Sequence, residues 1–106
     1  MPICNKKEAA KYFKKLADLG KDGAQLKYGE MLLAGDGIIK NQKEAIKYIK
    51  QASDNGNCDA QFLFGFWLFT GQGIKIDKEE AIYCFRKSKL KGNINATIMI
   101  KFVLNK

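Results

Sequence analysis

The sequence contains no histidine, a single proline and a single arginine among its 106 residues. Without histidine, the chain cannot build the Ser–His or Cys–His pairs of nucleophilic catalysis, or a metal site that uses imidazole. The low proline content, with glycine at only 10 positions, argues against low-complexity disorder. No apolar run approaches the roughly 20 residues that a membrane-spanning helix needs. The composition therefore predicts one soluble domain of ordinary size.

Cysteine is also scarce, and its three positions follow no metal-binding pattern. Cys4, Cys58 and Cys84 include no Cys-x-x-Cys pair, and no histidine is present to complete a zinc site. We therefore expect reduced structural thiols, no metal and no cofactor. The N-terminus runs from Met1 into charged residues without the apolar core of a signal peptide. These features predict a cytoplasmic protein.

Positive charge exceeds negative charge, because Lys and Arg total 19 while Asp and Glu total 11, a formal net charge of +8. Arg86 is the one arginine, whereas surfaces that read nucleic acid usually rely on the bidentate guanidinium group. Lysines spread evenly along a chain are more simply interpreted as the solvated faces of helices, since net charge governs association and not fold.

An internal repeat of 36 residues organises the remaining composition. Residues of the same type coincide when the sequence is laid on itself at this spacing. The aligned sets include Glu8, Glu44 and Glu80; Ala9, Ala45 and Ala81; Gly20, Gly56 and Gly92; Ala24, Ala60 and Ala96; and Leu32, Leu68 and Leu104. Chance does not align so many glycines and alanines in a chain this short, so we expect repeated structural units.

Each unit is predicted to contain two helices, one of which is amphipathic. Ala45, Tyr48, Ile49 and Ala52 lie at i, i+3, i+4 and i+7, which is one stripe of an α-helix. The same stripe recurs one repeat earlier, and we expect Tyr12 to occupy the core position of Tyr48.

Each amphipathic helix is preceded by a capping signal, an Asn or Asp followed three residues later by Glu. In such a capping box the N-cap oxygen and the glutamate carboxylate each accept an unpaired backbone amide. The glutamates are therefore interpreted as structural, not as general acids or bases. The three pairs are Asn5 and Glu8, Asn41 and Glu44, and Asp77 and Glu80.

The other helix of each unit is apolar on most sides, as the run from Ala60 to Phe69 shows, and is expected to be buried between neighbours. Gly29 and Gly65 lie within these helices, where glycine costs roughly 1 kcal/mol relative to alanine. We expect a close approach of a neighbouring helix to compensate for this cost. Gly35 and Gly71 follow the helices and suit left-handed C-caps.

The turns Gly35-Asp36-Gly37 and Gly71-Gln72-Gly73 superficially resemble phosphate-binding loops. A nucleotide fingerprint needs a preceding strand and further glycines or a Gly-Lys-Ser/Thr, and none of these is present. We interpret both segments as turns between helices.

This pattern resembles the Sel-one-like repeat (SLR), a relative of the tetratricopeptide repeat. The resemblance rests on Ala24, Tyr28-Gly29, Gly35-Asp36-Gly37, Ala45, Tyr48, Ala52 and Gly56, and then on Ala60, Phe64-Gly65, Gly71-Gln72-Gly73, Ala81 and Gly92. It covers about residues 5–105 and implies an all-α fold, a right-handed α/α solenoid of antiparallel helix pairs with about six helices. The domain 1–106 then holds a half unit at 6–19, repeats at about 24–55 and 60–91, and a terminal half repeat at about 95–105.

The last half repeat departs from the pattern, since Lys101 stands where Gly29 and Gly65 stand in the repeats before it. No outer helix follows to cover its apolar residues, and solenoids usually need terminal caps with a polar outer face. Either the chain is a piece of a longer array, or this end packs on a partner or on a second copy in a homodimer. The alternative is a local adjustment that buries the end within the chain.

The resemblance implies an adaptor, because SLR proteins scaffold complexes and bind partner proteins or peptides. A stacked array presents a concave face built from its inner helices, where apolar and aromatic anchors suit a helical or extended peptide. The alternative that these side chains are only interior packing remains open. The candidate partner-binding residues are Leu26, Glu30, Leu33, Phe62, Phe66, Phe69, Met99, Phe102 and Val103.

A second hypothesis is a basic module that contacts nucleic acid or an acidic surface. The single arginine argues against it, as does the assignment of most aromatic residues to the inner helices. Nothing in the sequence supports an enzyme. The outer-helix cations of this hypothesis are Lys11, Lys14, Lys15, Lys47, Lys50, Arg86 and Lys87.

Overall fold

The computed structural model describes residues 5–104, which form six α-helices and no strand. The predicted all-α fold is therefore confirmed. Cys4 and position 105, the last of the expected terminal half repeat, lie outside the described residues. The helices are α1 (Lys6–Asp18), α2 (Asp22–Ala34), α3 (Gln42–Asp54), α4 (Cys58–Thr70), α5 (Lys78–Leu90) and α6 (Ile94–Leu104).

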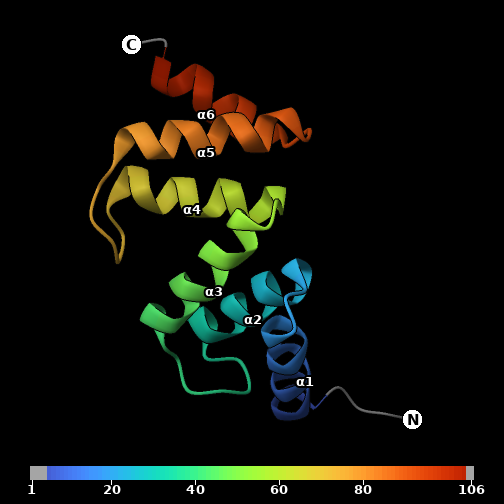
Figure 1. Ribbon diagram of the computed structural model, residues 1–106. Coiled ribbons are helices and arrows are strands. Elements are labelled where there is room, and N and C mark those ends of the chain that lie inside the picture. The colour runs from blue at the N-terminus through green and yellow to red at the C-terminus, as the bar shows by residue number, and fades with distance from the viewer. Residues whose placement is uncertain (1–4, 105–106) are drawn as a thin grey trace.

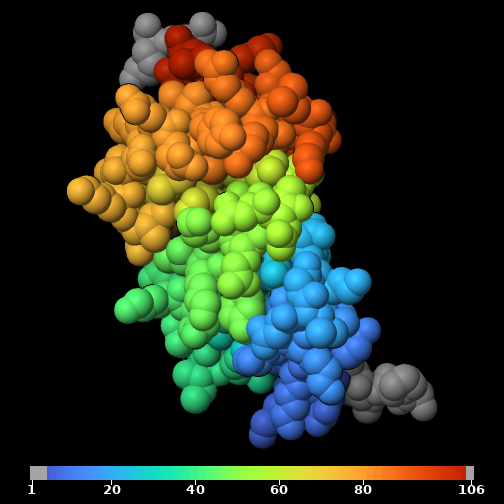
Figure 2. All heavy atoms as spheres, viewed as in Figure 1, coloured from blue at the N-terminus to red at the C-terminus, as the bar shows by residue number. Residues whose placement is uncertain are grey.

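The helices stack in chain order along one axis, so that α1 and α6 lie at opposite ends of the molecule (Figure 1). The stack measures 51 × 25 × 23 Å, and the space-filling view shows the same progression from one end to the other (Figure 2). Each helix packs against its neighbours in sequence, and the pairs α2–α3 and α4–α5 are the most extensive. We call α1, α3 and α5 the outer helices and α2, α4 and α6 the inner helices.

The outer helices begin where the capping signals predict. The side-chain oxygen of each N-cap accepts the amide of the glutamate three residues later, from Glu8 to Asn5 (3.3 Å), Glu44 to Asn41 (3.0 Å) and Glu80 to Asp77 (3.1 Å). Within residues 5–104 the glutamates do not accept the return bond from the N-cap amide, so only half of each capping box forms. The carboxylates still lie in the first helical turn, where the helix dipole favours negative charge.

The glycines within the inner helices mark close helix approach, as expected. A Cβ atom on Gly29 would lie 2.5 Å from Cγ1 of Ile49 in α3, and a Cβ on Gly65 would lie 3.0 Å from Cβ of Cys84 in α5. A larger residue at either position would push the outer helix away. Within residues 5–104 no outer helix packs on α6 after it, and Lys101 is exposed at the corresponding position.

The Gly-x-Gly turns both end one helix and contact another. Gly35 and Gly71 adopt the left-handed conformation at the C-caps of α2 and α4, with φ of +70° and +77°. The second glycine of each turn lies against the start of an outer helix one repeat earlier. A Cβ on Gly37 would overlap the backbone carbonyl of Lys6, and a Cβ on Gly73 would lie 2.7 Å from Nε2 of Gln42. Both segments are thus turns between helices, as the sequence predicts.

The core follows the stack as two adjoining clusters, one centred on Ile49 and Phe85 and the other on Tyr28 and Tyr48. Ile49 and Phe85 are both fully buried, and they occupy the same position one repeat apart. The rings of Tyr28 and Tyr48 meet edge to face with centroids 4.9 Å apart.

The prediction for Tyr12 is wrong. Its side chain is 60% exposed, whereas Tyr48 at the same repeat position is 7% exposed. The reason is the position of α1 at the end of the stack. Tyr48 is covered because α3 packs on α2, but α1 has no inner helix before it within residues 5–104.

Candidate functional site

The inner helices place one candidate residue each at the same repeat position, and all three are exposed. Glu30 lies on α2, Phe66 on α4 and Phe102 on α6, spaced by one repeat. Phe66 is 36% exposed and Phe102 is 66% exposed. We call this set the inner-face row. Exposed aromatic side chains in a row of successive repeats are the feature expected of a binding face.

Phe62 packs between the inner-face row and the core. Its ring stacks on that of Phe66, with centroids 6.4 Å apart, and lies 5.8 Å from the ring of the buried Phe85 in α5. Phe62 is half-buried, so it belongs partly to interior packing and partly to the surface. Its contact with the core limits the freedom of Phe66, which lowers the entropy lost when a ligand binds.

The flanking candidates Leu26, Leu33 and Phe69 are half-buried and pack against the core cluster around Ile49 and Phe85. The ammonium group of Lys78 lies 5.4 Å from the centroid of the Phe69 ring, a cation–π contact. These three side chains therefore expose only part of their surface beside the inner-face row.

The candidates on α6 are placed differently from one another. Met99 is half-buried against the core, and Phe102 is exposed. Val103 is half-buried at the repeat position of Met31 and Trp67, which are buried. Val103 follows Phe102 directly and so lies about 100° around α6 from it, away from the inner-face row.

The outer-helix cations of the alternative hypothesis are partly engaged within the chain. Lys14 forms an ion pair with Asp18 at 3.0 Å, and Lys50 forms one with Asp54 at 3.1 Å. The ammonium of Lys87 lies 4.4 Å from the centroid of the Tyr83 ring. Exposed pairs of this kind are worth little energy, but they reduce the charge available to a polyanion.

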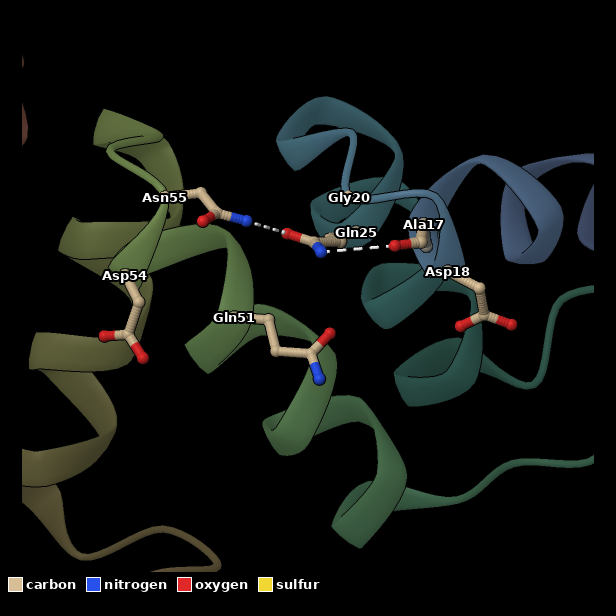
Figure 3. A pocket seen from close by; sticks show the side chains of 7 residues that line it. All are labelled: Ala17, Asp18, Gly20, Gln25, Gln51, Asp54 and Asn55. Atoms are coloured by element: carbon tan, nitrogen blue, oxygen red, sulfur yellow. Dashed lines mark hydrogen bonds between the residues drawn. The ribbon is translucent and has the colours of Figure 1, made fainter.

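Sequence reasoning did not predict the hollows on the outer-helix side. One, of about 370 Å³, lies where the end of α1, the start of α2 and the end of α3 meet (Figure 3). Gln25 crosses it, donating from Nε2 to the carbonyl of Ala17 (3.2 Å) and accepting from Nδ2 of Asn55 (3.0 Å) at Oε1. Gln51 and Asp54 complete its wall from α3. Because the amide nitrogen and the amide oxygen of Gln25 are both hydrogen-bonded, we interpret this hollow as a structural joint between α1, α2 and α3.

The corresponding joint in the next repeat is incomplete. Gln61 donates from Nε2 to the carbonyl of Ser53 at 3.4 Å, but its buried Oε1 has no partner within residues 5–104. Lys91 stands at the position of Asn55, and its ammonium donates to the carbonyl of Gly56 instead.

A second hollow, of about 650 Å³, lies between α1 and α3 over Tyr28. On its wall Tyr48 donates its hydroxyl to Oδ1 of Asp18 at 2.8 Å. Burial, and then this bond, raises the pKa of Tyr48 to about 12. The hydrogen bonds from Lys14 and Tyr48 hold the pKa of the Asp18 carboxyl below its usual range. Asp18 therefore stays ionised at neutral pH and joins α1 to α3.

No group of three or more Asp, Glu or Cys side chains in residues 5–104 is arranged to hold a metal ion. Among residues 5–104 no helix is both long and apolar enough to cross a membrane. Cys58 and Cys84 are free thiols, and burial raises the pKa of the Cys84 thiol to about 11. A thiol with a pKa this high is a poor nucleophile at neutral pH.

Comparison with known proteins decides the family. The Sel1 repeat model matches residues 2–21, 23–57 and 58–93. The chain belongs to the Sel1 repeat family. The SLR resemblance inferred from the glycine and alanine spacing is therefore confirmed, and the last helix, α6, lies beyond the matched residues.

Two solved Sel1 repeat structures have the same fold. A Sel1 repeat protein from Oxalobacter formigenes is 34% identical with a TM-score of 0.87, and the match covers 91% of this chain and 39% of that one. The protein c5321, described as a protective antigen of uropathogenic Escherichia coli with an SLR fold, is 25% identical with a TM-score of 0.88. That match covers 96% of this chain and 22% of c5321. This chain thus spans well under half the length of either relative.

No curated protein sequence matches the chain. Sel1 repeats generally form scaffolds for protein–protein interaction, and proteins built from them are typically non-catalytic.

Proposed function

We propose that this Sel1 repeat chain is a protein-interaction module that binds a partner protein or peptide on its inner helices. The observation that carries the proposal is the inner-face row, in which Phe66 and Phe102 are exposed one repeat apart. Covering an exposed aromatic side chain with a partner removes apolar surface from water, which stabilises the complex.

The row suits a ligand with apolar anchors at two successive repeats. Phe66 is held by the stacked ring of Phe62, and is therefore the best-ordered anchor. Glu30 ends the row with a negative charge, which favours a basic residue at one end of the ligand. Leu26, Leu33, Phe69 and Met99 supply the half-buried rim around these anchors.

The module acts without catalysis and without a cofactor in this proposal. Its charge of +8 governs encounter with acidic surfaces and not the choice of ligand. The two described cysteines are free, which supports function in a reducing compartment such as the cytoplasm.

A random peptide library displayed on phage tests the proposal directly. Peptides selected on the immobilised wild-type chain are expected to lose at least about tenfold in affinity against Phe66→Asp, because the substitution places a charge among the apolar anchors. Tyr83→Asp is the matched control. Tyr83 is also an exposed aromatic residue, at 56%, but it lies on the outer helix α5.

Circular dichroism of both variants establishes that they fold. Recovery of no peptide, or equal loss of affinity for Phe66→Asp and Tyr83→Asp, would contradict the proposed face. If instead only a single-stranded RNA probe binds, and Lys11→Glu and Lys47→Glu weaken it, the basic-module alternative takes its place.

A further inference from the structure

A smaller hollow of about 290 Å³ adjoins the hollow of about 650 Å³ between α1 and α3. Both have Lys14, Tyr28 and Ile38 in their walls, so the two are parts of one depression. Its floor belongs to α2, which packs against both outer helices (Figure 1). We call this depression the outer groove. It is separate from the inner-face row, no member of which lines it.

Tyr28 lies in the outer groove with its polar group unused. Its side chain is 5% exposed and lines both parts of the groove. Among residues 5–104 no group forms a hydrogen bond with its hydroxyl, whereas the hydroxyl of the adjacent Tyr48 donates to Asp18. Burial raises the pKa of Tyr28, so the hydroxyl keeps its proton at neutral pH. A buried tyrosine hydroxyl usually has a partner, and this one is a donor that lacks one.

The next repeat shows that packing does not require this hydroxyl. Phe64 occupies the position of Tyr28 and is buried to a similar degree, at 7% exposed. Cys84 likewise occupies the position of Tyr48 and is 2% exposed. The aromatic ring of Tyr28 therefore serves the core, and its oxygen is a feature of the pair α1 and α3 alone.

Positive charge predominates around the outer groove. Three lysines recur at i, i+4 and i+7 along α1, which places them on one side of the helix, and a fourth comes from α3. Of the two carboxylates, Asp18 is already bound by Lys14 and Tyr48. The charged side chains in the walls are Lys7, Lys11, Lys14 and Lys47 against Asp18 and Glu44.

The groove is not open merely because α1 is the first helix of the stack. In α3, which has a helix pair before it, Lys50 and Asp54 hold the positions of Lys14 and Asp18. Their side chains are 56% and 61% exposed, against 53% and 50% for the pair in α1. A preceding repeat thus leaves these positions open, and the groove lies between two successive outer helices of this chain.

We propose that the outer groove binds an acidic peptide segment of a partner protein. An Asp or Glu carboxylate of the peptide accepts hydrogen bonds from the Tyr28 hydroxyl and the Lys14 ammonium. A neighbouring apolar side chain of the peptide packs on Ile38 and Ile39, of which Ile39 is 87% exposed. Covering Ile39 removes apolar surface from water and adds to the affinity.

The walls favour a peptide over a nucleic acid. A polyanion places a phosphate at every nucleotide, and the carboxylates of Asp18 and Glu44 on the groove wall repel such dense charge. The isolated carboxylates of a peptide can be placed beside the lysines, with an uncharged residue between them. The exposed Ile39 also has no use for a phosphate, whereas it suits a leucine, isoleucine or phenylalanine of a peptide.

Selection on a chain whose inner-face row is disrupted tests this proposal separately from the proposed function. A random peptide library displayed on phage is selected on immobilised Phe66→Asp. The recovered peptides are expected to be enriched in Asp or Glu next to Leu, Ile or Phe. Peptides recovered on the wild-type chain alone would leave the inner-face row as a binding site and overturn the outer groove. A pool without acidic residues also overturns it.

Removal of a single oxygen tests the Tyr28 hydroxyl. In the Phe66→Asp background, Tyr28→Phe is expected to weaken the synthesised peptides by about tenfold in fluorescence anisotropy, because a hydrogen bond to a charged acceptor is lost. The ring remains, and Phe64 shows that a phenylalanine packs at this repeat position. Tyr83→Phe, an exposed tyrosine on α5, is the control that leaves the affinity unchanged. Equal affinity for Tyr28→Phe and its parent contradicts the proposed site.

Two lysines at equivalent repeat positions separate the site from the net charge. Lys14→Gln and Lys50→Gln each remove the cation of an exposed ion pair with an aspartate four residues later. Lys14→Gln is expected to weaken the peptides by about tenfold, and Lys50→Gln by less than about twofold. Equal losses would show a response to net charge alone and overturn the groove. So would tighter binding of a single-stranded RNA probe than of the acidic peptides. Circular dichroism checks that each variant folds.

Discussion

The two glutamine joints of the stack, at Gln25 and Gln61, differ in their hydrogen bonding because the equivalent position near each holds a different residue. Gln25 is satisfied at both ends, whereas Oε1 of Gln61 is buried without a partner in the described chain. The difference traces to Asn55 and Lys91, whose backbones are nearly identical, with φ, ψ of −85°, 4° and −95°, 8°. An unpaired buried acceptor costs about 1–3 kcal/mol, so this joint is a weak point in the second repeat.

We expect Lys91→Asn to raise the free energy of unfolding by about 1 kcal/mol, because its side-chain amide donates to Gln61 as Asn55 donates to Gln25. Urea denaturation followed by circular dichroism measures the change. In a Gln61→Leu background the same substitution has no acceptor to satisfy and is expected to add nothing. A gain of equal size in both backgrounds would show that the benefit arises elsewhere.

The sequence aligns Gln25 with Gln61, but it does not show that only Gln25 has hydrogen-bond partners at both its amide nitrogen and its amide oxygen. The bond from Asn55 to Gln25 joins residues 30 positions apart, a separation that the 36-residue repeat does not indicate. Local signals predicted the N-caps Asn41 and Asp77, since each cap and its amide lie three residues apart. Contacts between repeats require the three-dimensional stack.

Within one helix, two glycines have opposite structural roles. Beyond its own helix backbone and chain neighbours, Gly23 in the first turn of α2 has no described atom within 4 Å of the site of an added Cβ, whereas an added Cβ on Gly29 would lie 2.5 Å from Ile49. Gly23→Ala is expected to stabilise the chain by about 0.5–1 kcal/mol through helix propensity and unfolded-state entropy. Gly29→Ala is expected to destabilise it by about 1–3 kcal/mol through overpacking of α2 against α3.

Thermal melts of the two variants measure these opposite shifts in Tm. Both substitutions are Gly→Ala in α2, so helix propensity favours both variants. The difference between their Tm shifts therefore reports the contact with Ile49. Equal stabilisation by both would show that α3 moves away without loss.

Helix positions were predictable to within a few residues because caps, stripes and terminal glycines are local. The half unit expected at 6–19 is α1 at Lys6–Asp18, and the last helix, expected at about 95–105, is Ile94–Leu104. The exposure of Tyr12 was not predictable from its stripe, because a stripe identifies the face that can be buried and not whether a neighbour is present.

Across the whole molecule, burial declines toward α6. Its one buried residue among the described positions is Ala96, whereas α3 buries six residues, including Ile49 and Tyr48. Repeat proteins gain stability from contacts between neighbouring units, so an end unit with one neighbour opens more readily than a central one.

Hydrogen exchange is expected to show this gradient. Amides of α6 should exchange at least about tenfold faster than those of α3 and α4, because less buried surface opposes their opening. Two-dimensional NMR in deuterated buffer resolves the helices individually. Equal protection of α6 and α3 would indicate that the stack opens only as a single unit.

The candidate face was predictable in part at this scale. Phe66 and Phe102 are both candidates from the sequence, stand 36 residues apart and are both exposed. A helical wheel could not show that Phe62 divides its surface between Phe66 and the buried Phe85, since this depends on the position of α5. Nor could it show that Val103 is half-buried while Phe102 is exposed.

The second glycine of each turn limits how the length of this chain can change. Gly37 lies against the first residue of α1, and Asp36 beside it forms a 2.9 Å ion pair with Lys6. Gly73 lies against Gln42 in the same way. A residue inserted into or deleted from one of these turns shifts it relative to the helix it touches. Duplication or loss of a complete 36-residue unit carries each turn together with its contact, so tandem copying is the change in length that this architecture tolerates.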